Sequence, residues 1–424
     1  MTSMASVDPS VPPPDRSRES PRGPSTATER ALAPDLARGF MLLLIAVANT
    51  PWYLWGRDYT MSSIHPPDGA WWDQLTQIVI ITAVDGRIYP MFAFLFGYGM
   101  VQLLLRQEAA GVPERAALAL LRRRNLWLLV FGCAHAALLF MGDILGAYGL
   151  AGLVLAALFL RRSNRTLLVW SAVLGIVLLL FLAFSLLGAY AAAVLGEPVE
   201  QGFTPYKFAE STMAEDSYLH SVVERLLVWP LLVVMQGLLG LAVPIAILLG
   251  FWAARHRVLE QPEQNLRLLG WTAFVGIAVG WLGGAPHAVT HTGLVPFPED
   301  AMFVFSTLML PTGLAGGVGY VALFGLIGYW LRNRPSGPVT TAVSAVGKRS
   351  LSCYLAQSVV CAPLLAAWGL GLGAHLHSSS MALFAVAVWL VILLAAWGLE
   401  RAGRRGPAEV LLRRLTYRTA PDSR

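Results

Sequence analysis

Long apolar runs, separated by short polar connections, organise this chain from residue 39 to residue 399. A helix that crosses a bilayer needs about 20 mostly apolar residues. The pattern therefore predicts an all-α, polytopic membrane protein with about ten transmembrane helices, at residues 39–55, 75–105, 124–141, 144–160, 166–195, 226–253, 268–285, 302–330, 350–373 and 381–399. The longest runs exceed one span and must tilt, kink or protrude. In 75–105 we expect a break near Gly86 and Pro90, because proline cannot donate to the helical hydrogen-bond ladder.

Composition agrees with this pattern. Hydrophobic residues make up 56% of the chain and charged residues only 13%, whereas soluble domains carry about 25% charged residues. The chain has too few charged side chains to cover the surface of a water-soluble protein of this size. The composition therefore implies the lipid bilayer as its partner. Cys133, Cys353 and Cys361 all lie in apolar runs, which favours buried packing over a disulfide framework or a cysteine-based metal site.

The two ends of the chain differ from its middle. Residues 1–34 are rich in Pro, Ser, Thr and Arg, so we expect a disordered tail, with no apolar stretch that resembles a signal peptide. Residues 35–400 form the predicted helical transmembrane domain, and residues 401–424 a basic C-terminal tail. The largest outer connection, 196–225, is acidic and is expected to be partly helical.

The basic residues predict the orientation. With the N-terminal tail in the cytoplasm, every inner connection is basic, and of 31 Lys and Arg only Arg57, Arg87, Lys207 and Arg225 fall elsewhere. This agrees with the positive-inside rule, so both termini are expected in the cytoplasm. Because topology and attraction to the membrane surface explain the excess positive charge, no nucleic-acid partner is expected. The pattern leaves the oligomeric state open.

Polar residues inside apolar runs are the candidate functional groups, since burying them in a bilayer is costly. They are Asn49, Asp85, Arg87, His135, Asp143, Gln236 and Gln357. Most belong to the outer halves of their helices, so we expect them to line one cavity open to the exterior. The alternative is that the amides hold helices together and that Asp85 and Arg87 form a structural pair. Two histidine pairs, His287 with His291 and His375 with His377, are placed in outer loops, and no metal site is expected.

Four patches resemble the YeiB-like family of bacterial membrane proteins, whose C-terminal half, about 230–418 here, is a domain of unknown function (DUF418). The first patch holds Asp35, Arg38 and Gly39 before the run that contains Asn49; the second holds Asp85, Arg87 and Pro90 before Gly97 and Gly99. The third holds His135 with Asp143 and Tyr148, and the last holds Lys348, Tyr354 and Gln357 with Glu409 and Tyr417. The resemblance implies a protein of the bacterial cytoplasmic (inner) membrane.

The family is in turn distantly similar to transmembrane acyltransferases such as heparan-glucosaminide acetyltransferase. That similarity rests on Arg38 with Gly39, on Asn49, on His65 in the first outer loop and on Asp85 to Pro90. It implies acyl-coenzyme A as a donor, with His65 or His135 as the base and Asn49 as a hydrogen-bond donor. Arg38 would meet the anionic part of the donor. Binding roles are assigned to Asp35, Asp85, Arg87, Asp143, Tyr354 and Gln357.

Three functions therefore remain open at the level of sequence. The first is transfer of an acyl group from a cytoplasmic thioester to a cell-envelope or small-molecule acceptor, which needs a base and oxyanion donors. The second is transport or export of a small or amphipathic solute through the same polar residues. The third is a non-catalytic membrane scaffold.

Overall fold

The computed structural model describes residues 32–59, 63–67, 69–195, 205–298, 301–332, 334 and 337–417. In these ranges the regular elements are all helices. The α-helices are α1 (Leu32–Asn49), α2 (Trp71–Ala83), α3 (Ile88–Ala109), α4 (Glu114–Leu138), α5 (Ile144–Phe159), α6 (Asn164–Leu195), α7 (Pro205–Met213), α8 (Tyr218–Val234), α9 (Ala242–Arg255), α10 (Leu266–His291), α11 (Phe303–Leu331), α12 (Pro338–Lys348), α13 (Ser350–Leu365), α14 (Ser378–Arg401) and α15 (Pro407–Thr416).

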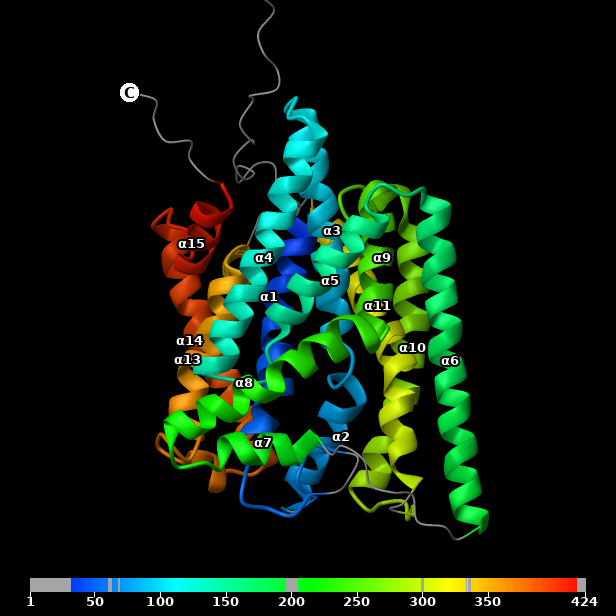
Figure 1. The fold of residues 1–424 in the computed structure, drawn as a ribbon, viewed down its shortest axis with the longest axis vertical. Coiled ribbons are helices and arrows are strands. Elements are labelled where there is room, and N and C mark those ends of the chain that lie inside the picture. Colours follow the sequence, from blue (N-terminus) through cyan, green and yellow to red (C-terminus); the bar gives the residue numbers. More distant parts are fainter. Residues whose placement is uncertain are drawn as a thin grey trace, which may run out of the picture.

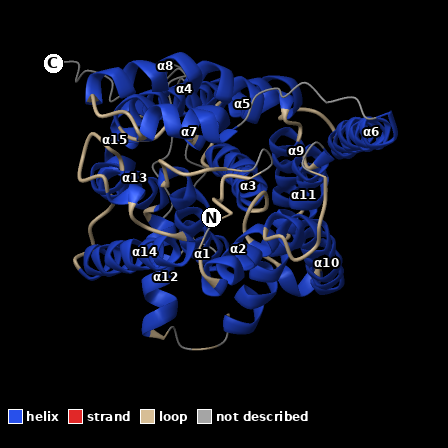
Figure 2. Ribbon diagram, turned by 90° about the horizontal axis from the view of Figure 1, so that it is seen from below, coloured by secondary structure: helices blue, strands red, loops and turns tan. Residues whose placement is uncertain are grey.

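The long helices run roughly parallel to one another in a bundle (Figure 1). Viewed along the bundle, α1 and α3 lie near its middle, and α6 stands at the rim (Figure 2). The central α3 is buried along most of its length, whereas α6 exposes Leu180, Phe184, Leu187 and Tyr190. A helix that exposes large apolar side chains in this way fits a lipid-facing position.

Seven segments in the described residues are long and apolar enough to cross a membrane: Ala33–Tyr53, Trp71–Ala109, Asn164–Ala191, Tyr218–Leu239, Leu266–His291, Phe303–Leu331 and Ser378–Arg401. The helices α5, α9 and α13 are also apolar but shorter, with 16, 14 and 16 residues. The predicted all-helical, membrane-spanning class is confirmed in these terms, and a total of ten spans stays a prediction.

The break expected in segment 75–105 is confirmed. Helix α2 ends at Ala83 and α3 begins at Ile88. Gly86, in the turn between them, has φ +75°, a left-handed conformation that side chains with a Cβ rarely adopt. Pro90 lies in the first turn of α3, where a missing N–H costs the ladder nothing.

The single helix predicted at 226–253 is wrong. The chain forms α8, then one π-helical turn at Met235–Leu239, and begins again as α9. Leu241, with φ 58°, directs the chain into the new helix, and α8 runs oblique to the upright α9 (Figure 1). Hydropathy indicates which residues avoid water, but it does not indicate where a helix changes direction. The apolar run therefore predicted one helix where the structure has α8 and α9. The connection 196–225 is partly helical, as expected, through α7 and the first turns of α8.

Both described ends of the chain lie at the same end of the bundle. Ala33 and Pro34, in the first turn of α1, line the same cavity as Thr416 and Tyr417, which end α15. The expected cytoplasmic tail at 1–34 lies outside the described residues except for Leu32, Ala33 and Pro34, which are helical. The structure thus places the two ends together, as two termini on one side of a membrane require.

Candidate functional site

A cavity of about 1380 Å³ lies at the end of the bundle where α1 begins. Binding sites for small molecules usually enclose roughly 300–1,000 Å³, so this cavity has room for a large ligand. Helices α1, α3, α4, α12 and α15 contribute to its wall, together with the loop that follows α9.

The cavity wall is strongly basic. Ten basic residues line it, and they are Arg38, Arg106, Arg124, Arg257, Arg332, Lys348, Arg349, Arg404, Arg405 and Arg413. Five acidic residues also line it, and they are Asp35, Glu260, Glu263, Glu400 and Glu409. The surplus of cations in a partly enclosed space concentrates positive potential there and favours anionic ligands.

The carboxylates of the wall are held by the protein itself. Glu400 pairs with Lys348 at 2.6 Å and with Arg349 at 2.7 Å. Asp35 pairs with Arg38, one turn along α1, at 3.4 Å. Hydrogen bonds from its own backbone amide and from Arg332 hold the pKa of Glu263 below its usual value. These acids pair with four of the ten basic residues of the wall, and the remaining cations keep the cavity positive.

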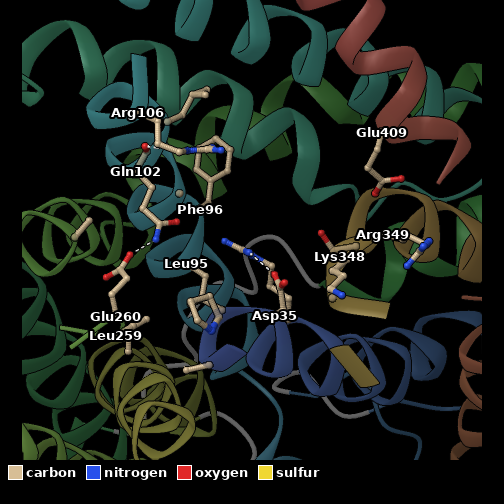
Figure 3. A pocket seen from close by; sticks show the side chains of 18 of the residues that line it. Asp35, Leu95, Phe96, Gln102, Arg106, Leu259, Glu260, Lys348, Arg349 and Glu409 are labelled. Carbon is tan, nitrogen blue, oxygen red and sulfur yellow. Dashed lines mark hydrogen bonds and ion pairs between the residues drawn. The ribbon is translucent and has the colours of Figure 1, made fainter. Parts of the chain in front are cut away.

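One part of the wall is apolar. It is formed by α3, whose Phe92, Leu95, Phe96 and Leu103 all line the cavity. Arg124 lies over the ring of Phe96, with its guanidinium carbon 5.7 Å from the ring centroid, a cation–π arrangement. In Figure 3, Gln102 points toward Glu260 on one side of the hollow, and Lys348, Arg349 and Glu409 stand on the other. The site thus joins a charged rim to an apolar floor.

The short helix α15 is fastened across one side of the cavity by a cap. The Glu409 carboxylate accepts hydrogen bonds from the backbone N–H of Leu351 at 2.9 Å and of Ser352 at 3.1 Å, and from the Ser352 hydroxyl. The Ser352 hydroxyl oxygen in turn accepts the Ala408 N–H at 2.9 Å. Glu409 of α15 therefore accepts from N–H groups at the start of α13, and Ser352 of α13 accepts from an N–H group at the start of α15; both starts would otherwise leave these groups unpaired.

A buried histidine–aspartate pair lies away from this cavity, at the break between α2 and α3. His65 Nε2 lies 2.8 Å from Asp85 Oδ2, and the His65 side chain is only 1% exposed. Arg87 does not share the Asp85 carboxylate; its guanidinium donates to the backbone carbonyls of Ile81, Asp85 and Gly280. The sequence could not show this, because a residue in an outer loop carries no signal of its burial.

A second histidine–aspartate pair joins α4 to the start of α5. His135 Nδ1 lies 2.9 Å from Asp143 Oδ1, and His135 Nε2 lies 2.8 Å from the Oγ of Ser358 on α13. Tyr354 packs its ring 5.1 Å from that of His135, and its hydroxyl oxygen accepts the Ile144 N–H at 3.3 Å. Sequence reasoning missed Ser358, although it directly follows Gln357 in the last of the four patches.

The sequence-predicted residues therefore occupy three places rather than one. Asp35 and Arg38 line the basic cavity, whereas His65, Asp85 and Arg87 form one buried cluster, and His135, Asp143 and Tyr354 form another. The amide of Gln357 donates to the Leu42 carbonyl at 2.7 Å, a bond between α13 and α1. Asn49 ends α1 and precedes the 3-10 turn Thr50–Tyr53. That the outer polar residues line one common cavity stays a prediction; the contacts given above are the hydrogen bonds and ring contact of these groups.

The histidine pair at 287 and 291 also needs correction. His287 and His291 lie in the last turns of α10, not in a loop, and both are buried. The ring of His291 lies 6.3 Å from that of His65, and His287 Nδ1 lies 3.4 Å from the sulfur of Met309. Within the described ranges, no group of three or more His, Cys, Asp and Glu side chains is arranged to hold a metal ion.

Comparison with known proteins places the chain among uncharacterized bacterial proteins. Residues 253–419 match the family described as "Protein of unknown function (DUF418)". The chain is 28% identical to the uncharacterized protein YxaH of Bacillus subtilis (strain 168) over 79% of this chain and 80% of the relative. It is 27% identical to the uncharacterized protein YeiB of Escherichia coli (strain K12) over 92% of this chain and 97% of the relative. The resemblance to the YeiB-like proteins is confirmed.

Proposed function

We propose that this YeiB-like membrane protein binds a coenzyme A thioester in its basic cavity and transfers the acyl group to an acceptor. The observation that carries the proposal is the cavity itself, which combines about 1380 Å³, a surplus of arginines and an apolar floor from α3. A coenzyme A thioester has the matching parts, namely anionic phosphates, a polar arm and an apolar acyl chain. Arginine is well suited to phosphate because its guanidinium donates in a planar fork.

The position of the cavity supports a cytoplasmic donor. It lies at the end of the bundle where both described chain ends meet, next to the most basic connections. The positive-inside rule assigns such an end to the cytoplasm, where coenzyme A thioesters are available. The two histidine–aspartate pairs supply the candidate bases, because a carboxylate beside an imidazole fixes the tautomer that can accept a proton.

Donor binding to the full chain in nanodiscs tests the proposal. Acetyl-coenzyme A is titrated against wild type, Arg38→Ala and Arg124→Gln, with Arg161→Ala as the matched control, because Arg161 pairs with Glu114 outside the cavity wall. A charge-assisted hydrogen bond contributes about 1.5–3 kcal/mol, so each cavity variant should weaken binding about tenfold or more. Binding that is equal in all four proteins, or absent from folded wild type, would reject the donor site.

The same nanodiscs separate the donor from other anions. Vesicle lipids with anionic headgroups, added as competitors, should leave the affinity for acetyl-coenzyme A nearly unchanged if the cavity is built for the nucleotide. Slow hydrolysis of the bound donor should be lost in His65→Ala or in His135→Ala, depending on which imidazole acts as the base. If the protein binds the donor but no preparation hydrolyses it or transfers its acyl group, the protein binds anions and is not an acyltransferase.

Interrupted helices favour transport as a second candidate function. The chain breaks between α2 and α3 and again at the π-helical turn between α8 and α9. In secondary transporters, broken helices often form the substrate site near the bilayer midplane. Solute uptake into proteoliposomes, with no covalent change in the solute, would establish this function in place of acyl transfer.

A further inference from the structure

Side chains from α13, from α4 and from the N-cap of α5 form a hydrogen-bonded chain in the interior of the bundle. The Ser358 Oγ lies 2.8 Å from His135 Nε2, and His135 Nδ1 lies 2.9 Å from Asp143 Oδ1. Serine, histidine and aspartate in this order and at these distances are the arrangement that activates a serine nucleophile, whatever the fold. If these groups only needed hydrogen-bond partners, any polar neighbours would serve. The order serine, histidine, aspartate therefore favours a catalytic role.

The aspartate end of the chain is held in position by the start of α5. Asp143 is the N-cap of α5, and its second oxygen accepts the Gly146 N–H at 2.7 Å. A carboxylate at a helix N-terminus is favoured by the aligned peptide dipoles. The Nδ1–H of His135 then donates to Asp143, and Nε2 is left to accept the proton of the Ser358 hydroxyl.

A buried phenol supplies the remaining part of such a site. The Tyr53 side chain is 2% exposed, and its hydroxyl lies beside Ser358. Within the described part of the chain this hydroxyl has no hydrogen-bond partner that meets normal geometry. An unsatisfied buried donor is costly to keep. Next to a serine nucleophile, it is placed to donate to the oxyanion that forms on a carbonyl under attack.

The chain of three lies beyond the floor of the basic cavity. Ser350 lines the cavity, and Ser358 is eight residues further along α13, about 12 Å at the helical rise. Phe92 and Phe96 form part of the floor, and both stack on Tyr148, with ring centroids 5.0 and 5.7 Å apart. A thioester whose phosphates are held at the arginines would enter past these rings with its acyl end first.

We propose that Ser358 is the nucleophile that accepts the acyl group and holds it as an ester during transfer; this rests on the donor function proposed above. The Ser358 Oγ–carbonyl bond forms as the carbon–sulfur bond breaks. The hydroxyl proton moves to His135 Nε2 and then to the departing thiolate sulfur. The acceptor hydroxyl next attacks the ester carbonyl, its proton passes to His135 Nε2, and His135 returns a proton to Ser358 Oγ as the ester bond breaks. Asp143 is a positioning residue.

Covalent labelling of the full chain in nanodiscs tests this step. Radiolabelled acetyl-coenzyme A is added without acceptor, the reaction is quenched in acid, and the label is located by mass spectrometry. We expect label on Ser358 in wild type and only background in Ser358→Ala. Ser358→Cys should carry a thioester that neutral hydroxylamine releases. Ser171→Ala is the matched control, because Ser171 is also a buried helical serine but donates only to the Leu167 carbonyl on α6.

The histidine and aspartate are tested by rates. His135→Gln should slow acetylation by roughly 100-fold or more, as expected for loss of a general base. Asp143→Asn should shift the pH at which acetylation reaches half its maximum, which a purely structural defect would not do. Thermal melting of each variant shows that it is folded, and Ser358→Cys keeps nearly the volume of serine if the alanine variant does not fold.

The outcomes distinguish the two proposals. Donor that binds with wild-type affinity while Ser358→Ala transfers the acyl group at the wild-type rate would overturn the nucleophile and leave the donor site standing. Absence of donor binding would overturn the donor site. A fluorophosphonate probe, which reacts with activated serines and needs no nucleotide, then tests separately whether Ser358 is an activated nucleophile. Label on Ser358 that is lost in His135→Gln supports it, and an unlabelled protein overturns it.

Discussion

His65 Nε2 and Asp85 Oδ2 lie 2.8 Å apart. This contact connects the loop that precedes α2 to the break between α2 and α3. The histidine is almost fully buried, and the aspartate side chain is 15% exposed. Arg87 fixes the same turn from the other side through the carbonyls of Ile81, Asp85 and Gly280. The break is therefore an organised polar junction and not a fray in one long helix.

Replacing Asp85 should weaken the fold. Asp85→Asn replaces the carboxylate beside a buried imidazole with an amide whose oxygen is a weaker acceptor, and a hydrogen bond to a charged group is stronger than a neutral one by about 1 kcal/mol. The free energy of unfolding, measured by denaturant in detergent micelles, should fall by this amount. Asp58→Asn is the control, because Asp58 is an exposed residue nearby in the chain. Equal stability of the two variants would contradict a structural role of the pair.

Replacing Glu409 should loosen α15. Glu409→Gln exchanges a carboxylate that accepts two backbone N–H groups and the Ser352 hydroxyl for a weaker neutral acceptor. Loss of such a cap costs about 1 kcal/mol. Amide hydrogen exchange in residues 407–416 should then become about fivefold faster. Glu108→Gln, at an exposed position of α3, should leave that exchange unchanged, and a similar acceleration in both variants would show that the cap is not the cause.

A methyl group at Gly97 should disturb the packing of α3 on α9. A Cβ built there would lie 2.6 Å from the carbonyl oxygen of Ile247 and 3.0 Å from its Cα. Backbone atoms cannot move aside cheaply, so Gly97→Ala should lower the free energy of unfolding by about 1–3 kcal/mol. Gly175→Ala on α6, where nothing lies within 4 Å, should be neutral or slightly stabilising. A Gly97→Ala protein as stable as wild type would contradict this close approach.

The orientation is tested by labelling from outside the cell. Single cysteines are placed at Gly403, near the basic cavity, and at Asp58, in a protein whose Cys133, Cys353 and Cys361 have been replaced by alanine. A maleimide that cannot cross the membrane should label intact cells at position 58 and require permeabilised cells at position 403. The positive-inside rule predicts this result, and the reverse labelling would place the basic cavity on the outer face.

The sequence by itself determined the properties that depend on neighbouring residues. Run length and hydropathy located the apolar helices, because burial in lipid acts on about 20 consecutive residues. The left-handed conformation at Gly86 and the missing N–H of Pro90 are local too, so the break near them could be predicted. The same local view failed at Leu241, since an apolar run stays apolar when the helix changes direction there.

Only the tertiary structure decided which polar groups meet. His135 and Ser358 are 223 residues apart in the chain, and their contact depends on how the bundle brings α4 and α13 within reach of each other's side chains. The basic cavity is likewise assembled from helices that are distant in sequence. The sequence could predict that its arginines share one side of the membrane, but it could not predict that they line the wall of one cavity. Hydrophobic periodicity records which face of a helix is buried, and it does not record the neighbour against which that face packs.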